Sequence, residues 1–495
     1  MHDIKDYFAG GKKLGFLAVS FSARATGESA WLLLGLTGMG FALGAQAFWV
    51  VLGEIIGVGG AWLFMSRRFK RLTDQYDSIT VPDYLESRFR DKSHQLRLIA
   101  AGSLLLFVPI YAGSQVHASG GAFFDFLGLN PYIGATIGFA IVLIYITQGG
   151  FTAVVWSDIF QGSLMVLGLV ILPIVAMLEI GGVTNVIESI RAIDPHLLSL
   201  HGPGQENAAG IIEPSTGSWN TATIFTIAGL TAIGIGFWGS PQIFVRYISM
   251  KSEKSIAPGT VTAIIWTLLA DSGAVLIGIT GRALFSKEIG LDSEAVLPVL
   301  SEALLPAFFA GVYIAMVLSA IMSTIDSLLV LASSAAVRDY WQKTKHPEMS
   351  DKQLMSMSRV LTLILAFIAF GIGMTLLMFE GNTKIFWIII FGWSGIAATF
   401  CPTMILSLYW SRFTANAAKC SMLAGLLSVL FFKFAAPKIL SALDMDTFSK
   451  YLGSLDVLLP SFIVGFATAI IVSLLDKKGQ ANLTGVKEDL QKAAA

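Results

Sequence analysis

Apolar runs long enough to cross a lipid bilayer as helices dominate the chain. Such a crossing needs about 20 mostly apolar residues, and twelve runs near this length occur in the 495 residues. Only 13% of the residues are charged, whereas soluble domains have about 25%. The sequence therefore predicts an all-α polytopic membrane protein. The runs lie near residues 14–43, 44–65, 98–127, 131–149, 151–179, 221–245, 258–281, 300–335, 358–379, 385–410, 414–432 and 457–475.

The positive side chains between these runs indicate how the chain lies in the membrane. With the N-terminus in the cytoplasm, 25 Lys and Arg residues fall in cytoplasmic segments and seven fall outside. Cytoplasmic loops normally carry this excess. We therefore expect a multi-pass protein of the plasma (inner) membrane with both termini cytoplasmic. Residues 180–220 then form an external loop, and Arg246 belongs to a cytoplasmic segment.

Two of the runs contain an interruption that marks a candidate transport site. Residues 22–31 place Arg24 and Glu28 at membrane depth, around Gly27. Charges inside a membrane usually face a pathway or a partner, and a broken helix is tolerated only where it lines protein or a cavity. The sixth run has a glycine-rich interruption at residues 234–241. Interruptions at corresponding positions of two halves indicate a transporter, and their separation by five runs indicates inverted halves.

The sequence gives little support for an enzyme, a nucleic-acid-binding protein or a solute sensor. The sequence has no His-Glu-x-x-His, Gly-x-Ser-x-Gly or phosphate-loop motif, which would indicate an enzyme. It has no basic tract of the kind that binds nucleic acid. A transporter-like solute sensor is another hypothesis. We expect such a sensor to carry a signalling domain, for which residues 476–495 are too short.

Ordered motifs occur along the chain at residues 6–15, 29–36, 80–84, 149–158 and 322–329. Together they resemble the sodium/solute symporter family, and in particular its sodium/proline branch. The resemblance implies a LeuT-like fold of two inverted five-helix repeats, about 12 transmembrane helices in this chain, and one more helix before Met1. The proline branch differs from this chain at four positions, with aspartate at Gly27, methionine at Glu28, tryptophan at Ile233 and tyrosine at Phe237.

The resemblance divides the chain into four parts. Residues 1–179 would form the first inverted repeat and residues 221–410 the second, joined by the external loop 180–220. Residues 411–495 would add two C-terminal helices and a cytoplasmic tail. The protein would work as a monomer in the lipid bilayer, with a small solute and Na+ as its ligands.

One face of the run 300–335 carries hydroxyl groups suited to sodium. Ser323, Thr324 and Ser327 follow Ala320 at helical spacing and share one face. Hydroxyls and freed carbonyls suit a hard cation, although packed helices also use such hydroxyls simply as contacts. The resemblance implies one sodium ion between the first and eighth runs. Its ligands would be the carbonyls of Ala25, Glu28 and Ala320 and the hydroxyls of Ser323 and Thr324.

A second ion site is a further expectation from the resemblance. Family members with a second sodium use the positions that match Asp158, Ser323, Asp326 and Ser327. Two carboxylates at one site repel each other unless a cation or a proton lies between them. The alternative is a structural role, in which Asp158 caps a helix or binds water.

Arg24 and Glu28 lie four residues apart and can pair on one helix face. In one interpretation they form an internal ion pair that faces a cytoplasmic vestibule. In the other, Glu28 touches the solute or carries a proton. A proton-coupled symporter using Glu28 or Asp158 is therefore an alternative hypothesis.

The solute site should lie between the two interruptions, where N–H groups at the ends of half-helices favour a carboxylate. We therefore predict a sodium-coupled symporter that imports a small organic solute by alternating access, with Na+ as the only metal ion. The solute would be an amino acid such as proline or another small carboxylate. The candidate solute-binding residues are Thr26, Gly27, Ser29, Tyr111, Phe237 and Gln242.

Overall fold

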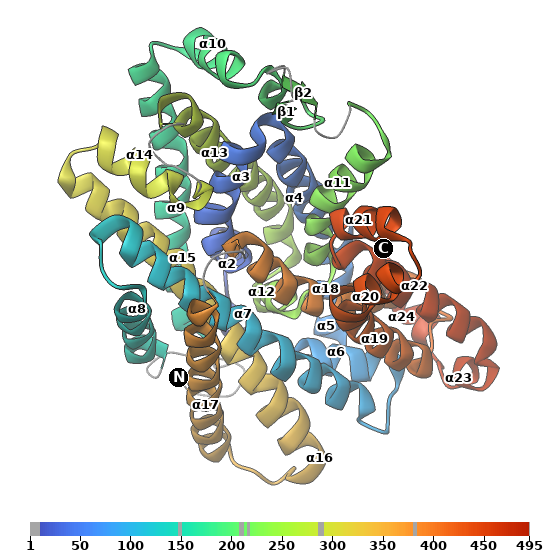
Figure 1. Ribbon diagram of the computed structural model, residues 1–495. Helices are drawn as coiled ribbons and strands as arrows, with labels where there is room; N and C mark the ends of the chain where they lie inside the picture. The colour runs from blue at the N-terminus through green and yellow to red at the C-terminus, as the bar shows by residue number, and fades with distance from the viewer. Residues whose placement is uncertain are drawn as a thin grey trace.

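Helices make up nearly all of the computed structural model, and the long ones pack side by side in one bundle (Figure 1). The expected family motifs at residues 6–15 and 149–158 lie partly outside the described residues. The structure describes residues 10–146, 151–206, 212–214, 218–285, 292–379 and 384–494.

The first half of the chain supplies the central helices and the only strands among the described residues, the short antiparallel pair β1–β2. Its elements are η1 (Gly10–Lys12), α2 (Phe16–Gly27), η2 (Trp31–Leu36), α3 (Thr37–Leu43), η3 (Gly44–Ala47), α4 (Phe48–Gly60), η4 (Ala61–Met65), α5 (Ser66–Gln75), α6 (Val81–Phe89), α7 (Gln95–Leu127), α8 (Pro131–Ile146), α9 (Phe151–Ile180), α10 (Val183–Ile193), η5 (Pro195–Leu198), β1 (Gly204–Glu206), β2 (Ile212–Pro214), α11 (Thr221–Ala232), η6 (Ile233–Trp238) and α12 (Pro241–Ser249).

The second half continues the bundle and ends in a short helix. Its elements are η7 (Glu253–Ser255), α13 (Ile256–Phe285), η8 (Ser293–Ala295), α14 (Val296–Leu304), α15 (Ala307–Ser334), η9 (Ala335–Gln342), α16 (Lys343–Lys345), α17 (Asp351–Met378), α18 (Ile385–Tyr409), α19 (Ala415–Leu430), η10 (Phe431–Ala435), α20 (Ala436–Ala442), α21 (Asp446–Ser454), α22 (Leu458–Leu475), α23 (Lys477–Ala481) and α24 (Val486–Ala494).

Ten helices among the described residues are long and apolar enough to span a membrane. The expected runs 14–43 and 44–65 meet at the turn at Gly44, with α2, η2 and α3 in the first run and α4 and η4 in the second. The apolar part of α8, Pro131–Ile144, is shorter than a full span. Each expected run nevertheless contains helix, and the prediction of an all-α polytopic fold is confirmed.

The turn between α3 and α4 requires a glycine. Gly44 has a φ of 58° and a ψ of −130°, a conformation that side chains with a Cβ rarely adopt. A Cβ at Gly44 would also lie 2.1 Å from the carbonyl oxygen of Leu197. The expected external loop 180–220 therefore packs directly against this turn.

The helices of the candidate site lie at the centre of the bundle. α2 packs against α9, α12, α13 and α15, and α15 packs in turn against α7 and α9. α8 and α17 lie on the outer side of α7, and α19 and α22 pack together against α18 (Figure 1). The interruption in α2 is therefore enclosed by protein, as broken helices in membranes must be.

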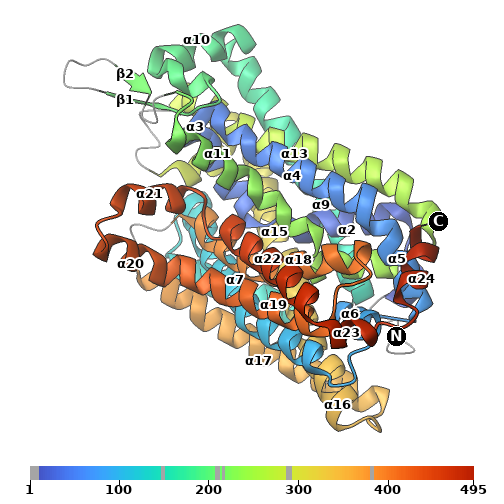
Figure 2. The same cartoon turned by 90° about the vertical axis from the view of Figure 1, so that its right-hand side faces the viewer.

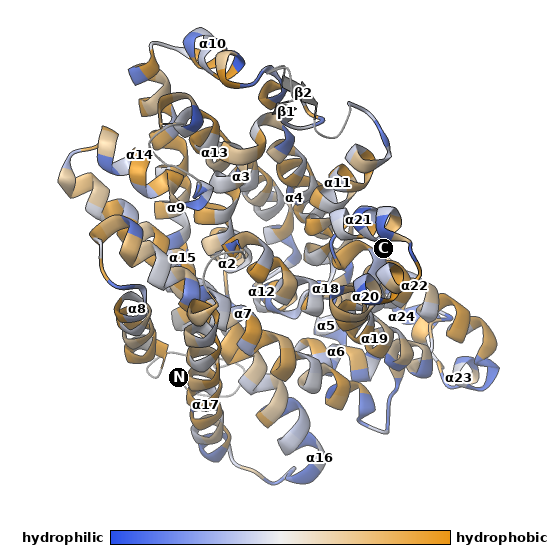
Figure 3. Ribbon diagram, in the orientation of Figure 1, coloured by the Kyte–Doolittle hydropathy of each residue, from blue (hydrophilic) through white to orange (hydrophobic). Residues whose placement is uncertain are grey.

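Short polar elements gather at opposite ends of the bundle. α10, β1 and β2 lie at one end, whereas α16, α23 and α24 lie at the other (Figure 2). The helices between them are largely hydrophobic (Figure 3), and large apolar side chains such as Phe308 and Leu475 are 76% and 77% exposed. This distribution fits a bundle with a lipid-facing belt.

Candidate functional site

α2 ends in the middle of the bundle, and this break frees backbone carbonyl groups. The helix ends at Gly27, and Glu28 follows in an extended conformation with φ −96° and ψ 135°. Helical structure resumes at Trp31 with η2. Carbonyl groups in the last turn of a helix have no partner within the helix. Those of Ala25 and Glu28 can therefore accept other donors or bind a cation.

Two hydroxyl groups of α15 meet these carbonyl groups. The Ser323 hydroxyl lies 3.0 Å from the carbonyl oxygen of Ala25 and 2.9 Å from that of Ala320. The Thr324 hydroxyl lies 3.2 Å from the carbonyl oxygen of Glu28. The structure thus brings together all five residues expected for the first sodium site, and each is 0% exposed. Neutral oxygen ligands in this number suit a hard monovalent cation.

A second polar cluster surrounds Asp158 of α9. The Asp158 carboxylate accepts hydrogen bonds from the hydroxyls of Ser22 at 2.6 Å and Thr26 at 3.4 Å, and it lies 3.3 Å from a guanidinium nitrogen of Arg246. Arg246 also donates to the Thr26 hydroxyl at 2.5 Å and to the Ser327 hydroxyl at 2.8 Å. The guanidinium group therefore links α12 to α2, α9 and α15.

The position of Arg246 corrects one expectation. The charge pattern assigned it to a cytoplasmic segment, yet its side chain is 1% exposed within the bundle. The reason is that α12 begins at Pro241, directly after the break in the sixth span, and continues to Ser249. A residue five positions beyond a mid-membrane break is still deep in the bundle, since each helical residue advances about 1.5 Å.

The four residues expected for a second ion do not all contact the same group. Asp158 and Ser327 both contact Arg246, whereas Ser323 bonds the carbonyls of the first site. The Asp326 carboxylate is fully buried and has no hydrogen-bond partner among the described residues. The carboxylates of Asp158 and Asp326 therefore have only the guanidinium group of Arg246 as a nearby positive charge among the described residues.

Phe237, in the break of the sixth span, fills the space beside Gly27. A Cβ at Gly27 would lie 2.8 Å from Phe237 Cε1. The Phe237 ring packs against the Trp393 ring at 5.1 Å between centroids, and the Trp393 indole donates to the Ile233 carbonyl at 3.0 Å. The two interruptions therefore meet through Phe237, and any larger residue at Gly27 would displace that ring.

Gln115 of α7 fixes the residues just after the break in α2. Its side-chain nitrogen donates to the Ser29 hydroxyl at 3.2 Å, and its side-chain oxygen accepts the Ala30 N–H at 3.2 Å. Tyr111 lies one turn earlier on the same helix and is 1% exposed. The Gln242 amide group is buried without a partner among the described residues. These groups can bind a polar solute.

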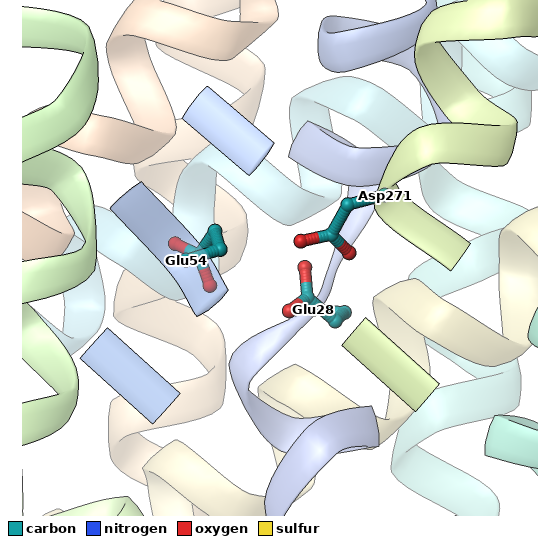
Figure 4. A group of neighbouring side chains, drawn as sticks. All are labelled: Glu28, Glu54 and Asp271. Carbon is teal, nitrogen blue, oxygen red and sulfur yellow. The ribbon is translucent and has the colours of Figure 1, made fainter. Parts of the chain in front are cut away.

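Thr26 is placed differently from the other solute candidates, because its hydroxyl joins the Arg246 cluster. The expected pair of Arg24 and Glu28 is present, with both side chains at most 1% exposed, so it faces no open vestibule in this structure. Glu54 of α4 and Asp271 of α13, which the sequence pattern left without a role, lie beside Glu28 (Figure 4).

The conformation is closed around these residues. A cavity of about 30 Å³ is lined by Arg246 and Ser327 together with Thr80 and Asp339. This volume is close to that of one water molecule. The Thr80 hydroxyl donates to the Asp339 carboxylate at 2.7 Å. No solute-sized passage through this cavity is open, and a change of conformation is required for access.

Sequence reasoning missed Arg246, Gln115 and Trp393. A signal for Arg246 exists, because it lies four residues after Gln242 and therefore on the same face of α12. Gln115 likewise lies four residues after Tyr111. No local pattern distinguishes Trp393 from the other tryptophans of the apolar runs.

Comparison with known proteins provides an independent view of the chain. The sequence model described as the Sodium:solute symporter family matches residues 7–425. The osmoregulated proline transporter OpuE of Bacillus subtilis is 31% identical over 99% of this chain and 94% of its own length. The high-affinity proline transporter PutP of the same organism is also 31% identical, over 99% of this chain and 96% of its own length.

Solved structures share the fold at lower sequence identity. A Na+-coupled sialic acid symporter in a substrate-bound outward-open state superposes with a TM-score of 0.74, at 19% identity over 96% of this chain and 92% of that chain. MhsT in complex with L-phenylalanine superposes with a TM-score of 0.51, at 15% identity over 92% of this chain and 97% of that one. These likenesses confirm the LeuT-like architecture.

Proposed function

This chain belongs to the sodium:solute symporter family and is a sodium-coupled solute symporter, and we propose that it imports a small amino acid such as proline, or another small carboxylate, by alternating access. The named function of its relatives supports proline as the first solute to test. The family consists of transporters rather than enzymes.

The convergence of Ser323 and Thr324 on the break in α2 carries the proposal. Their hydroxyls contact the carbonyls of Ala25 and Glu28 across the interface between α2 and α15. Sodium bound there would join the two helices and complete the solute pocket from the outside. Its release to the cytoplasm would let them separate. A membrane potential supplies about 2.3 kcal/mol per charge per 100 mV, or roughly 50-fold accumulation for one ion.

The solute would lie between the two interruptions. Gly27 and Ser29 would present backbone groups of the broken α2, and Tyr111, Phe237 and Gln242 would form the opposing wall. Half-helix ends with free N–H groups attract a carboxylate. In this arrangement Thr26 acts through the Arg246 cluster rather than by direct contact with solute.

A second sodium ion near Asp158 is also part of the proposal. Asp158 and Asp326 are both buried, and Arg246 supplies one positive charge. One uncompensated negative charge would remain if both carboxylates are ionised, and an isolated buried charge is costly. A second ion held by Asp158, Ser323, Asp326 and Ser327 would neutralise it.

We further propose that residues 1–179 and 221–410 are the two inverted repeats, with residues 180–220 outside and both termini in the cytoplasm. Residues 411–495 would add two helices and a tail. The separation of α10 and α24 to opposite ends of the bundle supports this orientation (Figure 2). The functional unit would be the monomer in the lipid bilayer.

The solute can be identified by a thermal-shift panel on the purified protein. L-proline, other amino acids, monocarboxylates and sugars are added singly, with sodium chloride or with choline chloride at equal ionic strength. We expect one class of small carboxylate to raise the melting temperature in sodium and far less in choline, because binding to the folded state stabilises it. A sugar that stabilises the protein while every carboxylate fails would contradict the proposed solute class.

A further inference from the structure

A compact group of acidic side chains lies beside the break in α2, and its carboxylates take no part in the proposed sodium and solute contacts. It comprises Glu28, Glu54 of α4 and Asp271 of α13, and one carboxylate oxygen from each lies within 4.8 Å of one oxygen of the other two. All three are 0% exposed. Three separate elements thus converge on one point at membrane depth (Figure 4).

Arg24 is the one basic side chain that contacts this group among the described residues. It is ion-paired with Glu28 and lies 3.6 Å from Glu54. Its guanidinium group lies 4.8 Å from the centre of the Phe237 ring and 5.3 Å from that of Trp266. Such cation–π contacts hold the guanidinium in place. With all three carboxylates ionised, the group has a net charge of −2.

Asp271 interacts with Arg24 electrostatically but has no hydrogen bond among the described residues. Both of its carboxylate oxygens are buried, and the carboxyl group points toward Glu28 (Figure 4). The hydroxyl of Tyr247 on α12, which interacts electrostatically with Arg24, is likewise buried without a partner in the described part of the chain. Unpaired buried charges of this kind are strongly unfavourable. A further positive ligand would remove the deficit.

We propose that Glu28, Glu54 and Asp271 form a binding site for a small monovalent inorganic cation, separate from the site on α15. Three oxygens within 4.8 Å of one another lie at most about 2.8 Å from a common centre, close to the distance of about 2.3–2.6 Å at which ions of calcium or sodium size take oxygen ligands. Arg24 contacts Glu28 and Glu54, and the ion would be held by one oxygen from each of the three carboxylates. The inference rests on the proposed sodium coupling.

Glu28 would connect this cation to the ion of the α15 site. Its carbonyl oxygen accepts a hydrogen bond from Thr324 of α15, whereas its carboxylate lies with those of Glu54 and Asp271. A cation at the acidic group would tie α2 to α4 and α13, just as the first ion would tie α2 to α15. Both ions would therefore hold the same break in place.

Equilibrium binding of radioactive sodium to the purified full-length protein, without any solute, tests the site. We expect Asp271→Asn and, separately, Glu54→Gln to bind one equivalent of sodium less than wild type at saturation. Each amide keeps the size of the side chain, and having two variants covers the failure of one to fold. Glu294→Gln is the matched control, because Glu294 is a buried carboxylate whose partners are the N–H groups of Ile385 and Phe386.

The outcomes separate this site from the proposed function. A wild-type protein that binds no sodium would overturn both. Sodium binding by wild type that Asp271→Asn and Glu54→Gln leave unchanged would overturn only the acidic-group site. If those variants instead lose affinity for proline while binding sodium as wild type does, the group serves the ammonium end of the solute and the inorganic-cation proposal is wrong. In the combined Ser323→Ala, Thr324→Ala variant, the equivalent removed by Asp271→Asn should persist.

Discussion

At the scale of single residues, the proposed first sodium site depends on two hydroxyl groups. Replacing Ser323 and Thr324 together with alanine removes both contacts to the α2 carbonyls and leaves α15 able to form. We expect sodium affinity to fall roughly tenfold or more, about the value of one or two hydrogen bonds to an ion. Sodium titration of uptake measures the change. Ser333→Ala is the control, because that hydroxyl bonds the Val330 carbonyl on the same helix and accepts from Thr362 of α17, not from α2.

We expect the loss of the Arg24 charge to reduce sodium-driven uptake more than the loss of the Glu28 charge. Glu28→Gln leaves Arg24 within reach of Glu54, so we expect a loss of sodium-driven uptake of roughly tenfold, comparable to one charge-assisted contact. Arg24→Ala leaves three buried carboxylates without their basic partner, and we expect a larger loss. Initial uptake rates at equal amounts of membrane protein compare the two. An Arg24→Ala protein as active as wild type would show that the pair has no role.

The Asp158→Asn variant tests whether a second sodium ion takes part in transport. If its carboxylate binds sodium together with Asp326, the Asp158→Asn protein should show a Hill coefficient for sodium that is reduced toward unity. The measurement is the sodium dependence of uptake at saturating solute. A wild-type Hill coefficient already at unity would mean that no second ion binds and that Asp158 has a structural role as the ion-pair partner of Arg246.

The hydroxyl face of the proposed first site could be predicted from the sequence, whereas the position of Arg246 beside Asp158 could not. The spacing of Ala320, Ser323 and Thr324 fixes them on one face of any helix, and the structure places that face against the break. Arg246 was misplaced because the positive-inside rule counts charges by sequence segment. Such a count cannot show that a half-helix starts at mid-membrane depth and carries its arginine inward.

At the scale of elements, α6 is tied to η9 and the start of α7 by a buried ion network. Arg97 and Arg338 lie 2.8 Å and 2.9 Å from the two carboxylate oxygens of Asp83. Burial alone would raise the pKa of Asp83, but these two guanidinium groups lower it from 3.8 to about 2. The carboxylate therefore favours the folded state most strongly when it is ionised.

The network predicts a stability that depends on acid pH. Because the folded pKa of Asp83 lies below the unfolded one, its contribution is complete above about pH 4 and disappears as the pH falls through about 2. Asp83→Asn should cost on the order of 2 kcal/mol near pH 7, and this cost should shrink as the pH falls from 4 toward 2. Thermal melting of both proteins across this range measures it.

The two helix breaks show what sequence patterns can locate. Charges and glycine in residues 22–31 predicted an interruption, and α2 does end at Gly27. The approach of Phe237 to Gly27 could not be predicted, since it depends on how the two broken spans pack across the bundle. The grouping of Glu28 with Glu54 and Asp271 could not be predicted either. These residues lie far apart in the sequence, and only the packing of the helices brings them together.

At the scale of the whole molecule, the apolar runs were sufficient to predict a helical membrane protein. The boundary between the first two runs, at residues 43 and 44, coincides with the turn at Gly44 between α3 and α4. Hydropathy reports the length of an apolar segment rather than its neighbours, so the runs alone could not show how the spans pack.

The closed state of the bundle implies that transport requires movement of α2 against its neighbours. The first-site residues are fully buried, and Thr80 and Asp339 seal the small cavity next to Arg246. A ligand shifts such an equilibrium only by binding one conformation more tightly. Sodium between α2 and α15 has this property, because its ligands come from both helices.

Uptake of radiolabelled L-proline into proteoliposomes under imposed ion gradients tests the central claim most directly. The purified protein is given an inward sodium gradient at equal pH, and then an inward proton gradient without sodium. The account predicts accumulation in the first condition only, lost in the Ser323→Ala, Thr324→Ala protein and retained at a reduced rate in Glu28→Gln. Accumulation driven by the proton gradient without sodium, and abolished by Glu28→Gln, would contradict it.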